Sequence, residues 1–336
     1  MKAVVVDRCG ETVWREVPDV PGPGAYQAIA RVRAFTICNS TDRHLRDCDY
    51  GGATQDDCPF VLGHESVGEV VAVGPKCRHL REGDLVFRPM AVVEGYGSFW
   101  GGFAEYGPVA DRRAYEEDGS PAGGPRVLKG HQVVAPGISP AHAVVLITLK
   151  EVMTYLGNIG AGEGSRLLVT GHGPVGLAAA DLGRRLLGCE RIVVAGRRPE
   201  AEAQVLDFGA DAWVDTREPD WAARAVELLG GPAGSIYETT GNPEVAAEAL
   251  KALADDGVFG PYAARPASAV GEMPTDPRMI GAGTDEGLSH DRICAATLDG
   301  TIEPECFITH RLAPERIAEG FDLIERRLAL KVVFEV

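Results

Sequence analysis

The 336-residue sequence predicts an α/β protein built from two domains. Short valine-rich runs separated by Gly and Pro turns extend to about residue 140, and strand and helix patterns alternate from there on. This alternation is typical of a doubly wound parallel sheet with helices on both faces. A domain usually takes about 100 to 200 residues, so the length allows two separate cores.

Each element is predicted from its local pattern. Residues 4–6, 67–73 and 85–87 are valine-rich and bounded by turn residues such as the PGPG of 21–24, which is typical of short antiparallel strands. The second part contains, in order, strand RLLVTG, helix 175–187, strand RIVVAG, amphipathic helix 200–208, and strands in SIYETTG and GVFGPY. Near the end, residues 313–328 have helical spacing, and LALKVVFEV closes as a strand.

Composition excludes several classes of partner. The 33 basic and 49 acidic side chains give a net charge of −16, which argues against nucleic acid and anionic membranes as partners. The sequence shows neither a signal peptide nor an apolar stretch long enough to span a membrane, so we expect a cytoplasmic protein. Its eight cysteines form no CxxC pair, and we expect most of them to be reduced and structural.

A glycine-rich turn predicts a dinucleotide site. Gly171, Gly173 and Gly176 form GHGPVG, which also contains Pro174 and Val175, between an apolar strand and a helix. Such glycines allow a tight turn and close backbone approach, and the helix N-terminus offers N–H groups to a pyrophosphate.

The cofactor is predicted from the end of the next strand. An NAD site usually has an acidic residue there, whereas this sequence has Gly196, Arg197 and Arg198. Guanidinium groups suit a 2′-phosphate, so the pattern favours NADP(H) over NAD(H). The alternative is that both arginines only coat a solvated turn.

Two further segments carry a family resemblance. Cys38 in FTICNSTDRH and His64 in VLGHESVGEVVAVG would each, alone, indicate an ordinary buried residue. Together, and followed by the glycine-rich turn, they resemble the zinc-dependent medium-chain alcohol and polyol dehydrogenases. REGDLV, GGFAEY and the LKVV ending extend the resemblance over nearly the whole chain. It implies a GroES-like β-rich catalytic domain, residues 1–145 with 286–336 returning to it, and a Rossmann domain over 146–285.

The resemblance also implies a zinc site. Cys38 and His64 match two ligands, and Glu65 matches a glutamate that binds the metal in some members and lies behind it in others. Glu151, in LKEVMTYL, is the best match to the third ligand, with an exposed helix residue as the alternative. The sorbitol, glucose and threonine dehydrogenase-like branch uses a carboxylate there, which points to a polyol, sugar or cyclitol.

The expected proton chemistry depends on an open coordination position of the zinc ion, where a substrate hydroxyl can bind. Zinc lowers the pKa of a bound hydroxyl and so favours loss of its proton. Ser40, or Thr41, matches the hydroxyl that accepts this proton, and His44 matches the histidine that passes it to solvent, unless His44 is simply exposed. CNSTD has one residue more than the usual motif, which leaves this register open. Thr240, in ETTG, matches a turn beside the nicotinamide.

One family feature is absent from the sequence. Residues 84–120 contain no cysteine, so we expect one catalytic zinc and no structural zinc. The segment 90–103 is predicted to be a loop near the cleft, where Phe99 and Trp100 either cover the substrate or pack in the core. A homodimer or homotetramer is implied by the resemblance alone.

The expected function is hydride transfer between NADP(H) and a secondary alcohol or ketone in a zinc-dependent oxidoreductase. One alternative is a zinc-free NADPH-dependent enoyl or quinone reductase, although such chemistry gives no reason to keep Cys38, His64 and Glu65. The other is a non-catalytic NADP-binding protein, because a fold does not fix a function.

Overall fold

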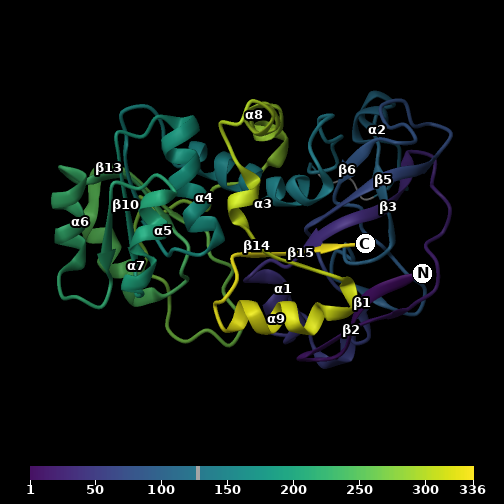
Figure 1. The fold of residues 1–336 in the computed structure, drawn as a ribbon, viewed down its shortest axis with the longest axis horizontal. Helices are drawn as coiled ribbons and strands as arrows, with labels where there is room; N and C mark the ends of the chain where they lie inside the picture. The colour runs from purple at the N-terminus through teal and green to yellow at the C-terminus, as the bar shows by residue number, and fades with distance from the viewer. Residues whose placement is uncertain (126–128) are drawn as a thin grey trace. The chain divides into compact units, whose positions relative to one another are not determined.

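The computed structural model describes residues 1–125 and 129–336 (Figure 1). The chain divides into two compact units, Met1–Ile147 with Glu303–Val336, and Thr148–Ile302. The predicted fold class is confirmed, since one unit is rich in antiparallel strands and the other is a helix-covered parallel sheet. Among the described residues, no helix is both long and apolar enough to cross a membrane.

The second unit, all of whose residues are described, is built on one parallel sheet. Its strands are β9 (Arg166–Thr170), β10 (Arg191–Gly196), β11 (Ala212–Asp215), β12 (Ala233–Glu238) and β13 (Leu253–Pro261), in the spatial order β11-β10-β9-β12-β13. The order reverses between β9 and β12, so this is the topological switch point at which such sheets bind ligands. The turns after these two strands are therefore the expected ligand site of the unit.

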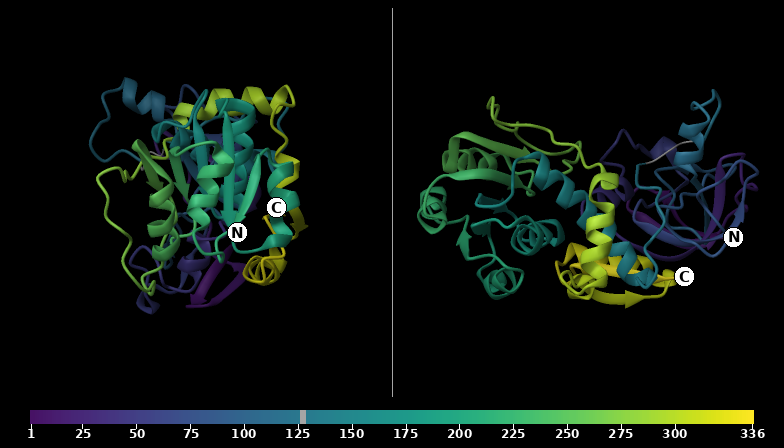
Figure 2. Two further views of the ribbon diagram at one scale, coloured as in Figure 1. Left: turned by 90° about the vertical axis from the view of Figure 1, so that its left-hand side faces the viewer. Right: turned by 90° about the horizontal axis from the view of Figure 1, so that it is seen from above.

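Helices cover both faces of this sheet (Figure 2). Leu168, Val193 and Ile236 pack with α6 (Trp221–Leu229) and α7 (Pro243–Ala249). On the other face α4 (Pro174–Leu182) lies against β9 and β10, and α3 (Pro140–Asn158) lies against β13. Residues alternate between the faces along each strand, which explains the continuous apolar runs seen in the sequence.

Two predicted helices end differently in the structure. The helix expected over 175–187 is α-helical only to Leu182, because residues 183–187 form a π-helical turn that closes at Gly188 with φ +72°. The segment 200–208 begins as a 3₁₀ turn and continues as α5 (Glu202–Asp207). The unit also contains α8 (Glu286–Leu298), whose Glu286 pairs with the buried Lys150 at 3.4 Å.

The first unit has two sheets in its described part. One has the order β2 (Glu11–Glu16), β1 (Lys2–Arg8), β4 (Phe60–Val61), β7 (Gly97–Ser98). The other has the order β14 (Ile308–Leu312), β15 (Lys331–Glu335), β3 (Gln27–Thr36), β5 (Ser66–Val73), β6 (Leu85–Phe87), with β8 (Tyr106–Ala110) also paired to β3.

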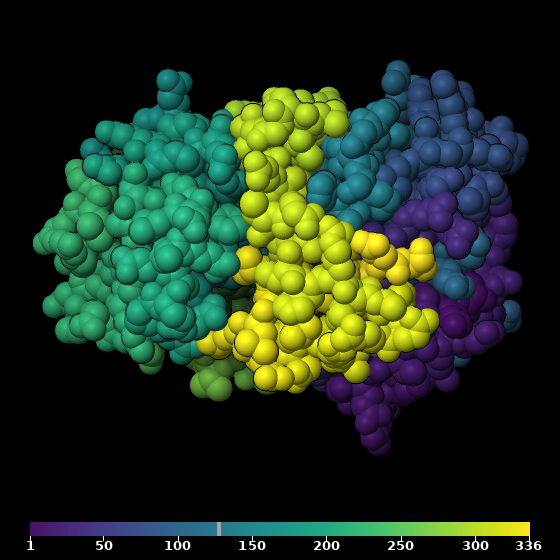
Figure 3. Space-filling model, in the orientation of Figure 1, coloured from purple at the N-terminus to yellow at the C-terminus, as the bar shows by residue number. Residues whose placement is uncertain are grey.

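An aromatic stack forms the centre of this unit's core. The ring of Phe35 lies 4.6 Å from that of Phe103 and 4.9 Å from that of Phe334. The helix α9 (Ile317–Glu325) contributes Phe321 to the same core and packs beside β2. In Figure 3 this yellow helix lies against the purple N-terminal residues. Segments from both ends of the chain thus share one core.

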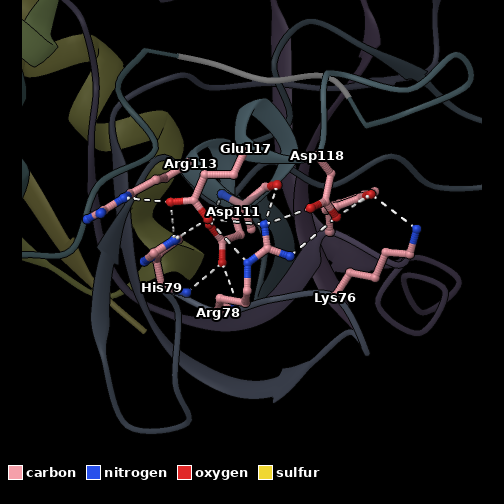
Figure 4. Close-up of polar contacts among 9 residues, drawn as sticks. Lys76, Arg78, His79, Asp111, Arg113, Glu117 and Asp118 are labelled. Atoms are coloured by element: carbon pink, nitrogen blue, oxygen red, sulfur yellow. Dashed lines mark hydrogen bonds and ion pairs between the residues drawn. The ribbon is translucent and has the colours of Figure 1, made fainter.

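Charged side chains around α2 (Arg112–Glu117) form a surface network (Figure 4). Asp111 caps the helix by accepting from the backbone N–H of Ala114 at 2.9 Å. The same carboxylate accepts from the backbone N–H groups of Arg78 and His79, each at 2.7 Å. Arg78 also pairs with Glu117 at 3.1 Å and with Asp118 at 3.0 Å, so the end of the helix is tied to the same segment.

Candidate metal centre and dinucleotide-binding turns

Three metal-ligating side chains meet in the first unit. Ligand atoms of Cys38, His64 and Glu65 all lie within 4.8 Å of one another. Cys38 follows the last residues of β3, and the other two residues directly precede β5, its antiparallel neighbour. Adjacent strands therefore bring together residues 26 positions apart in the sequence. A thiolate, an imidazole and a carboxylate form a donor set that suits Zn²⁺.

Asp42 orients this cluster. Its side chain is completely buried, and one oxygen pairs with His64 Nδ1 at 2.8 Å while the other accepts from the backbone N–H of Cys38 at 2.8 Å. Burial lowers the pKa of His64, but Asp42 and Cys38 outweigh it and raise this pKa well above its usual value. A carboxylate on one ring nitrogen leaves the other to a metal, as is usual for metal-binding histidines.

Glu65 is neutralised from the last strand. Lys331 of β15 donates to Glu65 Oε2 at 2.5 Å, and each side chain is only 3% exposed. Burial alone would raise the pKa of Glu65. The ammonium group of Lys331 opposes this effect, and the pKa is lowered overall. The carboxylate is therefore ionised. It can either bind a metal ion directly or lie behind the ion and offset its positive charge.

The candidate proton-transfer groups surround helix α1 (Thr41–Arg46). Ser40 is the residue before the helix, Thr41 is its first residue, and both are half-buried. His44 lies one turn along, and burial together with Arg43 lowers its pKa. An imidazole that is neutral near pH 7 is able to accept a proton.

Phe99 and Trp100, neighbours in segment 90–103, have different surroundings. The ring of Phe99 packs edge-on against Phe60 at 4.8 Å, which is a core contact. The ring of Trp100 lies 5.1 Å from that of His64. Arg88 donates to the backbone carbonyl of His64 from the segment before this loop. Trp100 is therefore the aromatic residue that borders the cluster.

Glu151 belongs to the second unit. It lies on α3 and accepts a hydrogen bond from Tyr262 at 3.2 Å. The ring of Tyr262 packs against the rings of Tyr155 and Tyr237. The assignment of Glu151 as a zinc ligand stays a prediction.

The glycine-rich turn has the form expected of a phosphate cradle. Gly171 has φ +96°, and a Cβ there would lie 2.3 Å from Thr239 Oγ1, so only glycine fits. A Cβ on Gly176 would lie 2.0 Å from the carbonyl oxygen of Gly171. Gly173 instead faces open space at the start of α4, followed by Pro174 and Val175. The first and third glycines thus serve packing, and the second leaves room for a ligand.

The end of β10 shows why no acidic residue stands there. A Cβ on Gly196 would lie 2.1 Å from His172 Nδ1, so the imidazole from the glycine-rich turn occupies that space. Arg198 donates from Nε to His172 Nε2 at 2.8 Å, while Arg197 is exposed. Two segments therefore combine to place a guanidinium group beside the turn.

The turn after β12 is held by a buried carboxylate. Glu238 accepts from the backbone N–H of Thr240 at 2.6 Å and from that of Gly241 at 3.1 Å. Burial raises the pKa of Glu238 despite these hydrogen bonds. Thr239 donates to the carbonyl of Thr170, the last residue of β9, at 2.6 Å. The turns on both sides of the switch point are thus fixed to each other.

Sequence reasoning missed three residues of the first-unit cluster. Asp42 stands in the motif of Cys38, yet only its buried hydrogen bond to His64 Nδ1 shows that it orients that ring. Lys331 stands in a strand otherwise made of apolar residues and a terminal Glu, and a lone lysine in such a run is the available signal of a buried ion pair. Arg88 gave no signal beyond its type.

Two family models match the chain. Residues 24–117 match the alcohol dehydrogenase GroES-like domain, and residues 174–280 match the zinc-binding dehydrogenase domain. The first contains Cys38, His64 and Glu65, and the second begins within the glycine-rich turn.

Individual proteins agree with these models over nearly the full length. The L-threonine 3-dehydrogenase of Bacillus licheniformis is 25% identical, with 95% of this chain and 94% of that protein covered. The NADP-dependent isopropanol dehydrogenase of Thermoanaerobacter brockii is 28% identical, with 98% and 96% covered. The structure of an alcohol dehydrogenase from Thermus sp. ATN1 has a TM-score of 0.80 at 22% identity and full coverage of both chains. The chain therefore belongs to the zinc-dependent medium-chain dehydrogenases, a family of oxidoreductases.

Proposed function

We propose that this protein transfers a hydride between NADP(H) and a secondary alcohol or ketone, with a polyol, sugar or cyclitol as its substrate class. The observation that carries the proposal is the convergence of Cys38, His64 and Glu65, with His64 oriented by Asp42. The relatives named for L-threonine and isopropanol act, by those names, on secondary alcohols. The polar substrate class rests on a carboxylate, Glu151, as the further ligand.

Cys38 and His64 would hold the zinc ion, with Glu65 or Glu151 as the third protein ligand. A zinc ion bound there supplies a Lewis acid that makes a substrate hydroxyl more acidic. Lys331 keeps Glu65 ionised, and Asp42 keeps His64 in one orientation. These two residues act by positioning the ligands.

The proton leaves through residues of this chain. Ser40 or Thr41 accepts it from the substrate hydroxyl, and His44 passes it to solvent. The lowered pKa of His44 supports this role, because the ring is largely unprotonated at neutral pH and is available as a base. Trp100, beside His64, would cover the substrate and exclude water.

The cofactor would bind along the switch point. Backbone N–H groups of 171–176 would donate hydrogen bonds to the pyrophosphate, and the turn of Thr240 would border the nicotinamide. Arg197 and Arg198 would bind the 2′-phosphate, and the absence of a side chain at Gly196 removes the carboxylate that would repel it.

Metal analysis tests the proposal. We expect about one zinc ion per chain, and Cys38→Ser to lose both zinc and turnover, because the thiolate is a ligand. Cys77→Ser, a change of another half-buried thiol, serves as the control and keeps both. Full activity in metal-free protein would favour the zinc-free reductase instead. A screen of alcohols and ketones with both nicotinamides then identifies the substrate.

The cofactor preference is tested separately. Arg197→Ala should raise KM for NADPH more than for NADH, because only NADPH carries the 2′-phosphate. An equal rise in KM for NADPH and NADH would show that Arg197 does not recognise the 2′-phosphate. The proposed zinc chemistry would not be affected by that result.

A further inference from the structure

A second cluster of sulfur atoms lies in the first unit, apart from the proposed ligand set. Cys9 stands in the turn between β1 and β2, Cys48 follows α1, and Cys58 precedes β4. Their sulfur atoms all lie within 4.8 Å of one another, and all three residues are half-buried. Cys9 and Cys48 form a disulfide, while Cys58 is a free thiol. The disulfide was not predicted from the sequence.

Besides the disulfide, two hydrogen bonds hold these segments together. The backbone N–H of Cys9 donates to the side chain of Gln55 at 3.1 Å, and that of Gly10 donates to the carbonyl of Arg46 at 2.8 Å. The first contact joins the hairpin turn to the segment of Cys58, and the second joins it to the helix before Cys48. Reduction of the disulfide therefore leaves three thiols still close together.

Their spacing suits a metal ion. Zinc binds thiolates at about 2.3 Å in a tetrahedral arrangement, which puts ligand sulfurs roughly 3.8 Å apart. The sulfurs of Cys9 and Cys48, which are bonded in the disulfide, would have to separate by roughly 1.7 Å, whereas that of Cys58 lies within 4.8 Å of both and would need to approach them by no more than about 1 Å. Turn residues and a residue after a short helix can make such shifts through side-chain rotation.

The surrounding charge favours a cation. The carboxylates of Asp57 and Asp7 act electrostatically on Cys58. Asp57 directly precedes Cys58 in the chain, and both carboxylates are exposed. A metal ion bound by the sulfurs would offset the negative charge of the thiolates beside these carboxylates.

We propose that reduction of the Cys9–Cys48 disulfide creates a three-thiolate zinc site from Cys9, Cys48 and Cys58. A dithiol reductant supplies two electrons and two protons, is itself oxidised to a disulfide, and leaves three thiols. Zinc then displaces three protons and forms three sulfur–metal bonds, with water as the fourth ligand. The site is separate from Cys38 and is closed to zinc when the disulfide is present.

Zinc content in two redox states tests this site. Full-length protein is reduced with dithiothreitol, freed of reductant by gel filtration without oxygen, exposed to zinc and desalted beside an oxidised sample. We expect the reduced protein to hold about one more zinc ion per chain than the oxidised protein. Cys58→Ser should abolish that difference, because it removes one ligand and leaves the disulfide pair, while Cys77→Ser should retain it. Equal zinc content in both states of the wild type would overturn the proposal.

Two further measurements guard against misfolding and against confusion with the Cys38 centre. In reduced wild type, zinc should protect Cys58 from iodoacetamide, as measured by peptide mass spectrometry, and an unchanged alkylation rate would contradict the site. The redox-dependent zinc should persist in Cys38→Ser. Its loss there would show that the extra ion belongs to the other centre, whereas a Cys38→Ser protein that keeps all its zinc would contradict the proposed function alone.

Discussion

At the residue scale, His172 decides which side chains position 196 accepts. Its ring fills the space into which a Cβ of residue 196 would project, and Arg198 donates to the same ring. The lack of an acidic residue after β10 is therefore a packing requirement as well as an electrostatic one. Sequence reasoning found the glycine and both arginines, but the imidazole 24 positions earlier could not be connected to them without coordinates.

A pair of variants separates packing from charge at this position. Gly196→Asp alone should fold less stably and gain no preference for NADH, because its side chain meets His172. The double variant with His172→Ala should accommodate the carboxylate and raise the ratio of kcat/KM for NADH over NADPH by at least about tenfold, roughly 1.4 kcal/mol. Steady-state kinetics with both cofactors measure this, and His172→Ala alone is the control. A switch in Gly196→Asp alone would show that the ring yields freely.

The buried pair of Lys331 and Glu65 should matter greatly for stability. Lys331→Met leaves an unpaired buried carboxylate and should lower the free energy of unfolding by about 3–5 kcal/mol. Lys331→Met combined with Glu65→Gln should recover part of that loss, because no isolated charge remains. Urea unfolding of chelator-treated protein measures both. A loss under about 1 kcal/mol in the single variant would mean that another cation replaces the lysine.

At the element scale, patterns predicted the strands and helices better than their ends. The strand–helix alternation in the second part of the chain, from Leu146 on, could be predicted because hydrophobic periodicity reports local burial. The shortening of α4 at Leu182 depends on the π-helical turn ahead of Gly188, which periodicity does not encode. The pairing of β15 with β3 joins residues about 300 positions apart, beyond the reach of any local pattern.

Helix α2 depends on one cap. Asp111 accepts three backbone hydrogen bonds, one from the helix and two from residues 78 and 79. Asp111→Ala should destabilise the protein by at least about 2 kcal/mol, since it removes a cap and leaves two further donors without an acceptor. Asp111→Asn keeps one acceptor oxygen and should cost less. Urea unfolding at pH 7 ranks the variants, and equal costs would show that the carboxylate charge, not the number of acceptors, is what matters.

At the scale of the whole molecule, acid should weaken the first unit through Glu117. His79, Arg78 and Arg113 lower the pKa of this exposed carboxyl to about 2 (Figure 4). Because the folded pKa lies below the unfolded one, the contribution is complete above the unfolded pKa near 4.5 and is lost as the pH falls towards 2. Glu117→Gln should therefore have a lower Tm than wild type at pH 7, and the two should converge near pH 2. A constant difference across that range would assign the effect to packing.

Much of the site could be predicted because family motifs mark it, and the rest depends on how distant segments meet. Cys38, His64 and Glu65 stand in two short motifs, and the structure brings them together. Asp42 and Lys331 could not be ranked above other charged residues, since only burial distinguishes them. The half-buried cysteines 9, 48 and 58 lie up to 49 positions apart, and nothing in their spacing indicates proximity.

The position of Lys331 in the sequence constrains when a working centre can form during synthesis. When the segments that contain Cys38 and Glu65 have left the ribosome, the strand that carries Lys331 has not yet been synthesised. In a nascent chain halted before that strand, Glu65 lacks the ammonium group of Lys331, and β3 lacks its pairing with β15. The ion pair of Glu65 thus forms only after residue 331 has been synthesised.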